Sequence, residues 1–216
     1  MARGNLDFRI HEGERTPEQF IADTTLGQKR ENKFTIEMAE MMSEIGSRIR
    51  VLDYKALNDH IGEIIEDENY KDEGDAWFQF QIGETGCFFE ITADIKHRDI
   101  FKKNSEEQSF TFAIKKHAFE RALSSGFAIL MVWRREDEAV MYRWFTKTEI
   151  ESINNRYAMP LDEYKGRRGY KLFKDHYDWL EWGDFNSDKA VRMLSRVALE
   201  LGVIDEVDIP VSWRQD

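Results

Sequence analysis

Asp75, Asp94 and Lys96 are the residues of this chain whose types and spacing best suit catalysis. Between Asp75 and Lys96, two stretches of alternating apolar and polar residues flank a Gly-Glu-Thr-Gly turn, which predicts a β-hairpin. If Ile82 pairs with Cys87, every facing pair on one side of the ladder is apolar, and Asp75 stands opposite Asp94 on the other side. Facing carboxylates repel each other, and a divalent cation such as Mg²⁺ between them would remove that repulsion. Lys96, further along the same face, would then orient or deprotonate a water molecule or stabilise negative charge.

Two glutamates could join this group. Glu31 lies seven residues before Met38 and near the apolar stripe of an expected helix, where a carboxylate needs a partner or a metal ion. Glu90 shares the outward face of the second hairpin strand, so it is an alternative to Asp94 as the second metal ligand. The same polar strand face would also suit simple exposure to solvent, and the residues alone leave that interpretation open.

The elements that would position these side chains follow an α/β order. Thr16-Pro17-Glu18-Gln19 predicts a helix start, with a cap, a proline at the first helical position and an early acid. Periodicity and turn residues predict the remaining elements: a helix over about 27–45, a strand over 49–54, the hairpin, a strand or helix start over 109–114, a helix over 115–123, a buried strand over 127–133, a strand over 139–145, a short helix from 148 and a capped helix over 187–201. This order predicts an α/β domain with a mixed central β-sheet flanked by helices.

The same residues resemble a known superfamily. Gly27-Gln28-Lys29-Arg30-Glu31-Asn32-Lys33-Phe34 is similar to the G-x-K-x-E-x-x-F helix of PD-(D/E)XK, or restriction-endonuclease-like, nucleases. Asp75 matches the aspartate of their second core strand, and Ile91-Thr92-Ala93-Asp94-Ile95-Lys96 matches the (D/E)-x-K of the third. The resemblance spans about residues 24–145. The chain departs from the pattern in having Gly74 where a proline often precedes the first acid, and Asp94 in place of glutamate.

This resemblance implies a restriction-endonuclease-like core of order αβββαβ with a helical C-terminal extension. It divides the chain into an N-terminal segment (1–23), a nuclease-like core (24–150) and an extension packed on the core (151–216). The implied activity is Mg²⁺-dependent (or Mn²⁺-dependent) hydrolysis of phosphodiester bonds in DNA. Asp75 and Asp94 would hold the metal, Lys96 would orient the water and Glu31 would be an accessory acid. RNA as the substrate, a homodimer, and a catalytically inactive interaction or regulatory module are also compatible with the resemblance.

Composition limits the partners that this chain can use. Its 216 residues carry a net charge of −11, so binding to nucleic acid must depend on local basic patches. The best candidate patch is the glycine-punctuated loop with Lys165, Arg167, Arg168 and Lys171. A basic stripe formed by Lys189, Arg192 and Arg196 is typical of the solvent face of a packed helix. The single cysteine excludes an intrachain disulfide, and the lack of a long apolar run predicts a cytoplasmic protein that does not enter membranes.

Overall fold

A six-stranded mixed β-sheet organises the computed structural model, which describes residues 16–43, 47–57, 73–83, 86–98, 102–103, 110–115, 120, 124–134, 139–161, 167–173 and 176–214. The strands lie in the order β1-β2-β3-β6-β7-β10, with β3 and β6 parallel and the other neighbours antiparallel. Their bounds are Ile49–Ala56, Ala76–Ile82, Phe88–Arg98, Ala128–Arg134, Val140–Phe145 and Leu180–Glu181. The predicted α/β class with a mixed sheet is therefore confirmed.

The β2–β3 hairpin has the predicted register. Phe78 faces Ile91, Phe80 faces Phe89, and the Ile82 N–H donates to the Cys87 carbonyl at 3.0 Å. A slip by one residue would turn these buried aromatic and aliphatic side chains to water, so the apolar face fixes the register. The opposite face of the hairpin consequently carries its polar side chains.

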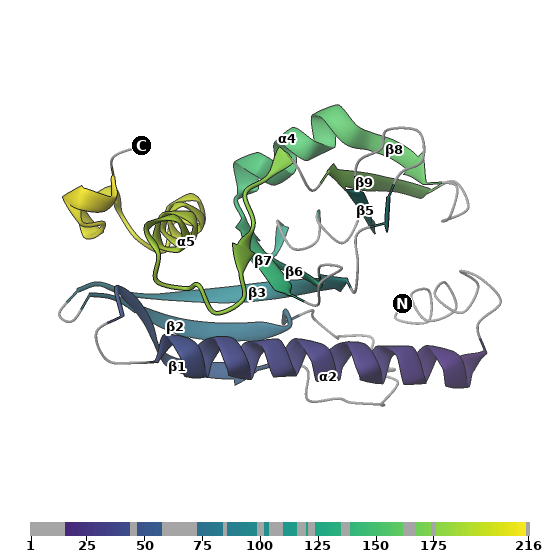
Figure 1. Cartoon of the computed structure of the whole chain (residues 1–216), viewed down its shortest axis with the longest axis horizontal. Helices are drawn as coiled ribbons and strands as arrows, with labels where there is room; N and C mark the ends of the chain where they lie inside the picture. The colour runs from purple at the N-terminus through teal and green to yellow at the C-terminus, as the bar shows by residue number, and fades with distance from the viewer. Residues whose placement is uncertain are drawn as a thin grey trace.

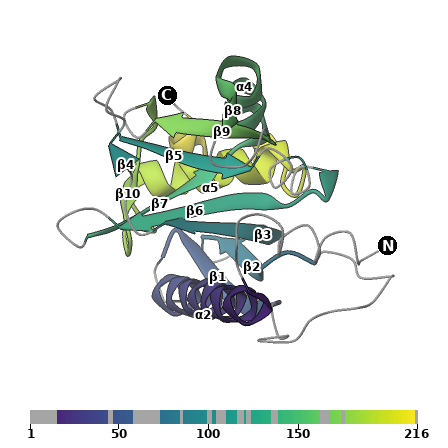
Figure 2. The same cartoon turned by 90° about the vertical axis from the view of Figure 1, so that its right-hand side faces the viewer.

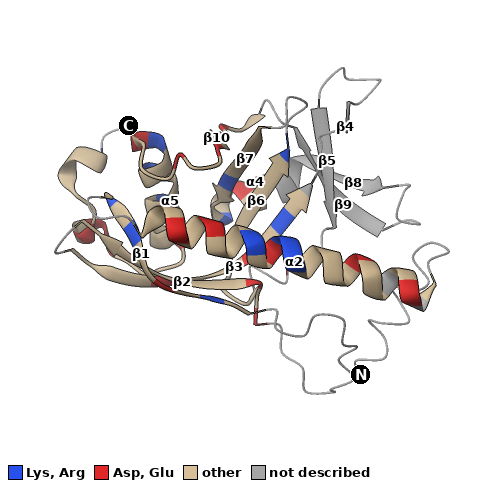
Figure 3. Cartoon of the chain, turned by 60° about the horizontal axis from the view of Figure 1, so that its bottom comes forward, with Lys and Arg blue, Asp and Glu red and all other residues tan. Residues whose placement is uncertain are grey.

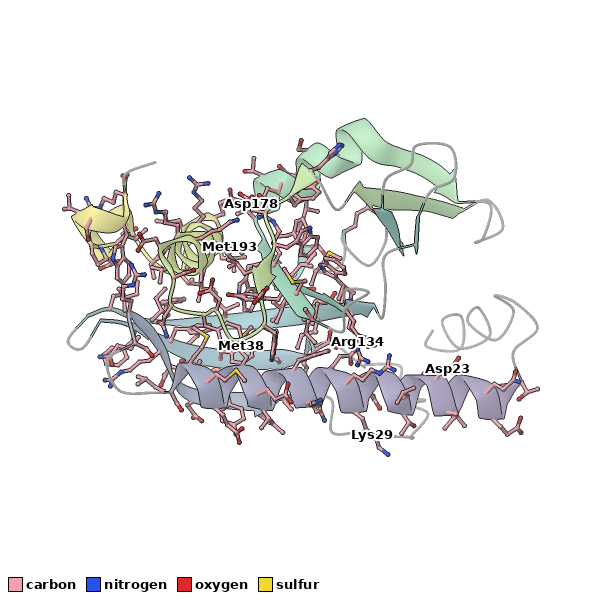
Figure 4. The ribbon with its side chains drawn as sticks, viewed as in Figure 1. Asp23, Lys29, Met38, Arg134, Asp178 and Met193 are labelled. Carbon is pink, nitrogen blue, oxygen red and sulfur yellow. The ribbon has the colours of Figure 1, made fainter. Side chains whose placement is uncertain are left out.

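Helix α2 (Pro17–Met42) packs along this sheet and is longer than predicted. Thr16 caps it through a reciprocal pair of hydrogen bonds with Gln19, as its sequence predicts. The helix start predicted at Thr16 and the helix predicted over about 27–45 belong to one continuous helix, in which Gly27 costs only about 1 kcal/mol. The predicted stop at Gly46 lies outside the described residues. Figures 1 and 4 show α2 along the sheet, with Met38 on its inner side and Lys29 pointing away.

One hydrophobic core joins α2 and α5 (Asp188–Glu200) through one face of the sheet. Ser187 caps α5 as predicted, and Gly202 follows its end with a φ of +70°. Trp182, next to β10, packs edge-on against Phe34 of α2, with 5.2 Å between the ring centres, and also against Tyr142 of β7. The C-terminal part of the chain therefore completes the same core as the N-terminal helix.

A second sheet lies beside the first and was not predicted as a unit. It has the order β4-β5-β9-β8, with bounds Lys102–Lys103, Phe110–Lys115, Arg167–Phe173 and Ala158–Leu161. Helix α4 (Lys147–Tyr157) contacts β9. In Figure 1 this sheet lies on the side where β3 ends, and α5 lies toward the other end; Figure 2 shows the same sheet from the side.

Several expected elements need correction or fall outside the described residues. Residues 151–216 are not purely helical, because β8, β9 and β10 pair with strands that are distant in sequence. The segment predicted as a strand or a helix start is strand β5, Phe110–Lys115; the helix predicted to follow lies mostly outside the described residues. The expected boundary at residue 23 falls inside α2. Among the described helices, none has the length and apolar character needed to cross a membrane.

Candidate active site

Asp75 is joined to the neighbouring strand by its backbone and its side chain. It precedes β2 directly, and its N–H donates to the Ala93 carbonyl at 2.9 Å. Its Oδ2 accepts from the Ile95 N–H at 2.6 Å. These bonds to the residues on either side of Asp94 hold the Asp75 carboxyl beside Asp94, as the hairpin register predicts.

Asp94 is a buried carboxyl between an acid and a base. Its residue surface is 5% exposed, and its carboxyl also bonds to that of Asp75 and forms an ion pair with the Lys96 ammonium. Burial raises the pKa of Asp94 from its ordinary 3.8 to about 7; the Lys96 charge opposes this rise, and the Asp75 carboxyl adds to it. Asp75 and Asp94 therefore lie together beside the Lys96 ammonium, in a site largely shielded from water.

Lys96 stays positively charged in this setting. Burial by itself would lower its pKa, but the charges of Asp94, Asp75 and, more weakly, Glu31 outweigh burial and raise it. The ammonium thus partly neutralises the facing aspartates. A cation is consequently part of the electrostatic balance of this site.

Glu31 lies near the site but contacts a different residue. Its Oε1 is 3.7 Å from His97 Nε2, and the His97 ring lies 6.4 Å from that of Phe34 on the same helix. Successive residues of a strand point to opposite faces, so His97 faces α2 while Lys96 faces away from it. Glu31 therefore influences Lys96 through its charge, from the α2 side of β3. The Glu31–His97 pair was not predicted, because a helical stripe does not show which strand residue it meets.

Glu90 lies apart from Asp94, and three of the basic candidates belong to the second sheet. Glu90 is exposed and accepts a hydrogen bond from Gln79 Nε2 at 3.2 Å. It is four residues from Asp94 on one strand, or about 13 Å at the usual rise per residue. Arg167, Arg168 and Lys171 occupy positions on β9 in the second sheet, whereas Lys165 lies outside the described residues.

The carboxyl pair is suited to a hard divalent cation. Among the described residues, no cluster of three or more His, Cys, Asp or Glu side chains is arranged as a metal cage. Mg²⁺ does not require such a cage, because proteins commonly hold it through one or two carboxylates and leave the other positions to water or substrate. Asp75 and Asp94 supply that number of carboxylates. Burial and, to a lesser degree, the Asp75 carboxyl raise the pKa of Asp94, and a bound cation would favour its charged form.

Gly74 sets the approach of Asp75 to β3. Its φ is +85°, and a Cβ atom there would lie 2.7 Å from Thr92 Cγ2 and 3.2 Å from the Ala93 carbonyl oxygen. A side chain would therefore be strained in its backbone and would push against the strand that carries Asp94. Proline is also incompatible with this position, because its φ is fixed near −65°. The glycine found where the resemblance leads one to expect proline thus has a structural role.

Gly74→Ala is expected to lower the cleavage rate beyond the effect of its lost stability, because the new side chain moves Asp75 relative to Asp94. Gly202→Ala is the matched control: Gly202 also has a positive φ, +70°, but nothing lies within 4 Å of its missing Cβ. Both variants should lose about 1–2 kcal/mol of unfolding free energy from backbone strain. Melting temperatures and cleavage rates measured together would separate the two effects, and equal activities in both variants would contradict the role given to Gly74.

The mixed sheet carries the carboxyl pair directly before β2 and on β3. Among solved structures, the chain is similar to that of Hjc, a Holliday junction resolvase from the archaeal hyperthermophile Archaeoglobus fulgidus. The two share 10% sequence identity with a TM-score of 0.37, over 74% of this chain and 94% of Hjc. No protein-family model and no curated protein matches the chain. Conclusions about activity therefore depend on the site residues themselves.

Proposed function

We propose that this protein is a metal-dependent endonuclease that hydrolyses phosphodiester bonds in DNA at Asp75, Asp94 and Lys96. The observation that carries the proposal is the buried Asp94 beside the half-buried Asp75 across the β2–β3 hairpin, with Lys96 adjacent. Burial of an acid beside a second acid costs stability and raises the pKa of the buried carboxyl, and such perturbed acids are typical of functional sites. RNA shares the same phosphodiester chemistry and is the alternative substrate.

Each residue has a distinct role in this proposal. Asp75 and Asp94 would hold Mg²⁺ or Mn²⁺, which when bound supplies Lewis-acid stabilisation of the charged transition state. Lys96 would orient the attacking water and stabilise negative charge as it develops on the phosphate. Glu31 would keep Lys96 protonated through its negative charge, which agrees with the raised pKa of the lysine. Glu90, paired with Gln79, takes no part in this scheme.

Binding of DNA must overcome the net charge of −11. Acidic and basic residues are interleaved along α2 (Figure 3), so this helix presents no continuous basic face to a phosphate backbone. The second sheet is a better candidate surface, because Arg167, Arg168 and Lys171 lie on β9 and Lys102 and Lys103 form β4, directly after the strand of Asp94 and Lys96. We propose that DNA binds along this sheet; Lys165, the fourth basic residue expected there, lies outside the described residues.

The raised pKa of Asp94 predicts that the stability of the metal-free protein falls with pH. Below 3.8 this carboxyl is protonated in both the folded and the unfolded chain. Between 3.8 and about 7 the folded state keeps a proton that the unfolded state has lost, so the unfolding free energy decreases as pH rises and levels off above about 7. Asp94→Asn lacks this titration. Subtracting its melting curve from that of the wild type in EDTA isolates the effect, and a difference independent of pH would contradict it.

Metal binding tests the proposal directly. Calorimetric titration with Mn²⁺ should show saturable binding that Asp75→Ala abolishes, and binding should strengthen from about pH 6 to about pH 8 because the metal competes with the proton on Asp94. Glu90→Gln, which removes a charge from the same face of the hairpin, is the matched comparison. Absence of Mn²⁺ binding would overturn the proposal and favour a catalytically inactive interaction module.

A further inference from the structure

A small cavity lies between α5 and the C-terminal segment that holds η3 (Glu206–Asp208) and η4 (Val211–Trp213). Figure 1 shows this segment beside α5, at the end of the molecule away from the second sheet. The cavity has a volume of about 130 Å³, and its lining residues are Arg192, Ser195, Arg196, Leu199, Glu206, Ile209, Trp213 and Arg214. None of these belongs to the candidate active site.

The charge of the cavity wall is opposite to that of the chain. Three arginines and one glutamate line the cavity, in a protein whose net charge is −11. Arg192 and Arg196 are four residues apart and so share one face of α5. Arg196 is exposed, as expected for the solvent face of a packed helix, and both arginines also line the cavity. Arginine is the side chain best suited to planar, multidentate recognition of phosphate or carboxylate oxygens.

Arg214 is fixed in place on the opposite wall. Its Nε donates to the Ile209 carbonyl at 2.8 Å, and its Nη2 donates to the Val207 carbonyl at 3.1 Å. A guanidinium has five N–H donors, so these two bonds hold it while donors remain for a ligand. Trp213 beside it is held by the Arg48 guanidinium, 5.8 Å from the ring centre. The wall is therefore organised before any ligand binds.

Ser195 provides an independent sign of a ligand. It is 3% exposed and lines the cavity, and its Oγ has no hydrogen-bond partner among the described residues. Buried hydroxyl groups are nearly always hydrogen-bonded, because an unsatisfied one costs about 1–3 kcal/mol. An acceptor atom placed in the cavity would be the partner that this hydroxyl lacks among the described residues.

We propose that this cavity binds a phosphate-class oxyanion, with Arg192, Arg196 and Arg214 neutralising its charge and Ser195 donating a hydrogen bond. The cavity is smaller than the 300–1,000 Å³ that is usual for small-molecule sites, so it fits an isolated oxyanion group and not a whole nucleoside. The phosphate could belong to a free phosphate compound or to a nucleic-acid backbone. Glu206 is the one acidic residue among the described residues of the cavity wall, and its negative charge would favour a protonated form of the phosphate over the fully charged one.

The test uses inorganic phosphate and the full chain in EDTA, which keeps the aspartate pair free of metal. ³¹P NMR should show saturable binding by the wild type and by Lys189→Gln, a control that removes a charge from the same helix at a residue outside the cavity wall. Ser195→Ala should weaken binding by about tenfold or more, as expected for a lost hydrogen bond to a charged group. Arg192→Gln should weaken it at least as much.

The outcomes separate the sources of the phosphate. Displacement of the bound phosphate by a short DNA duplex would identify a nucleic-acid backbone, and displacement only by a phosphate monoester would identify a free compound. Either result supports the site. Absence of saturable binding, or equal binding by the wild type, Ser195→Ala and Arg192→Gln, would overturn it. Because the experiment needs neither metal nor cleavage, its result is independent of the proposed nuclease activity.

Discussion

Asp94→Asn is expected to reduce DNA cleavage by about a thousandfold or more while the protein remains folded. The substitution keeps the size of the side chain but removes a metal-binding charge, and metal stabilisation of a phosphoryl transition state is worth several kcal/mol. Because Asp94 is buried with a pKa raised to about 7, the neutral amide should leave the metal-free protein at least as stable as the wild type near neutral pH. Initial cleavage rates and melting temperatures in EDTA measure the two effects.

Glu90→Gln is the comparison that gives this result its meaning. It removes a carboxylate from the same strand face, but at an exposed position that is hydrogen-bonded to Gln79. We expect cleavage by Glu90→Gln to stay within about threefold of the wild-type rate, as for other exposed substitutions. If Glu90→Gln loses activity and Asp94→Asn keeps it, Glu90 is the second ligand and the assignment of Asp94 is wrong.

Lys96→Met is expected to reduce cleavage by about a hundredfold to a thousandfold, the range observed when one preorganised donor is removed from a transition state. Methionine preserves the long unbranched shape but not the charge. Loss of the ammonium also removes the interaction that lowers the pKa of Asp94, so that pKa should rise further above 7. Metal binding by Lys96→Met should therefore require a higher pH than metal binding by the wild type.

Lys96→Arg separates the two roles of this lysine. Arginine keeps the positive charge near Asp94 and Asp75, so the pH dependence of Mn²⁺ binding should stay close to that of the wild type. Its planar fork cannot place a single ammonium against the attacking water, so the cleavage rate should still fall. Full activity in Lys96→Met, with unchanged pH dependence, would show that Lys96 has neither role.

The hairpin could be predicted in detail because its information is local. Alternation of apolar residues on both sides of one turn fixes the register of the hairpin. That register places Asp75 opposite Asp94. The same reasoning extends to β6, whose continuous apolar run is buried on both faces. Local patterns therefore sufficed for the central strands and for the aspartate pair.

The parts that escaped prediction depend on contacts between distant segments. Strands β4 and β10 have two residues each, too few to show a period, and β8 and β9 are defined by pairing across the second sheet. The position of Glu31 beside His97 depends on how α2 sits on the sheet. The sequence shows only that Gly74 stands where a proline is often found. Its structural role could not be predicted, because the close approach to Thr92 exists only in the folded chain.

Cleavage of DNA in the presence and absence of metal tests the central claim most directly. Supercoiled plasmid, branched DNA and single-stranded RNA are each incubated with the wild type in Mg²⁺, in Mn²⁺ and in EDTA, with Asp94→Asn alongside to reveal contaminating nucleases. The account predicts cleavage of DNA by the wild type that requires metal and is lost in Asp94→Asn. Equal cleavage by the two proteins, or no cleavage of any substrate in either metal, would contradict it.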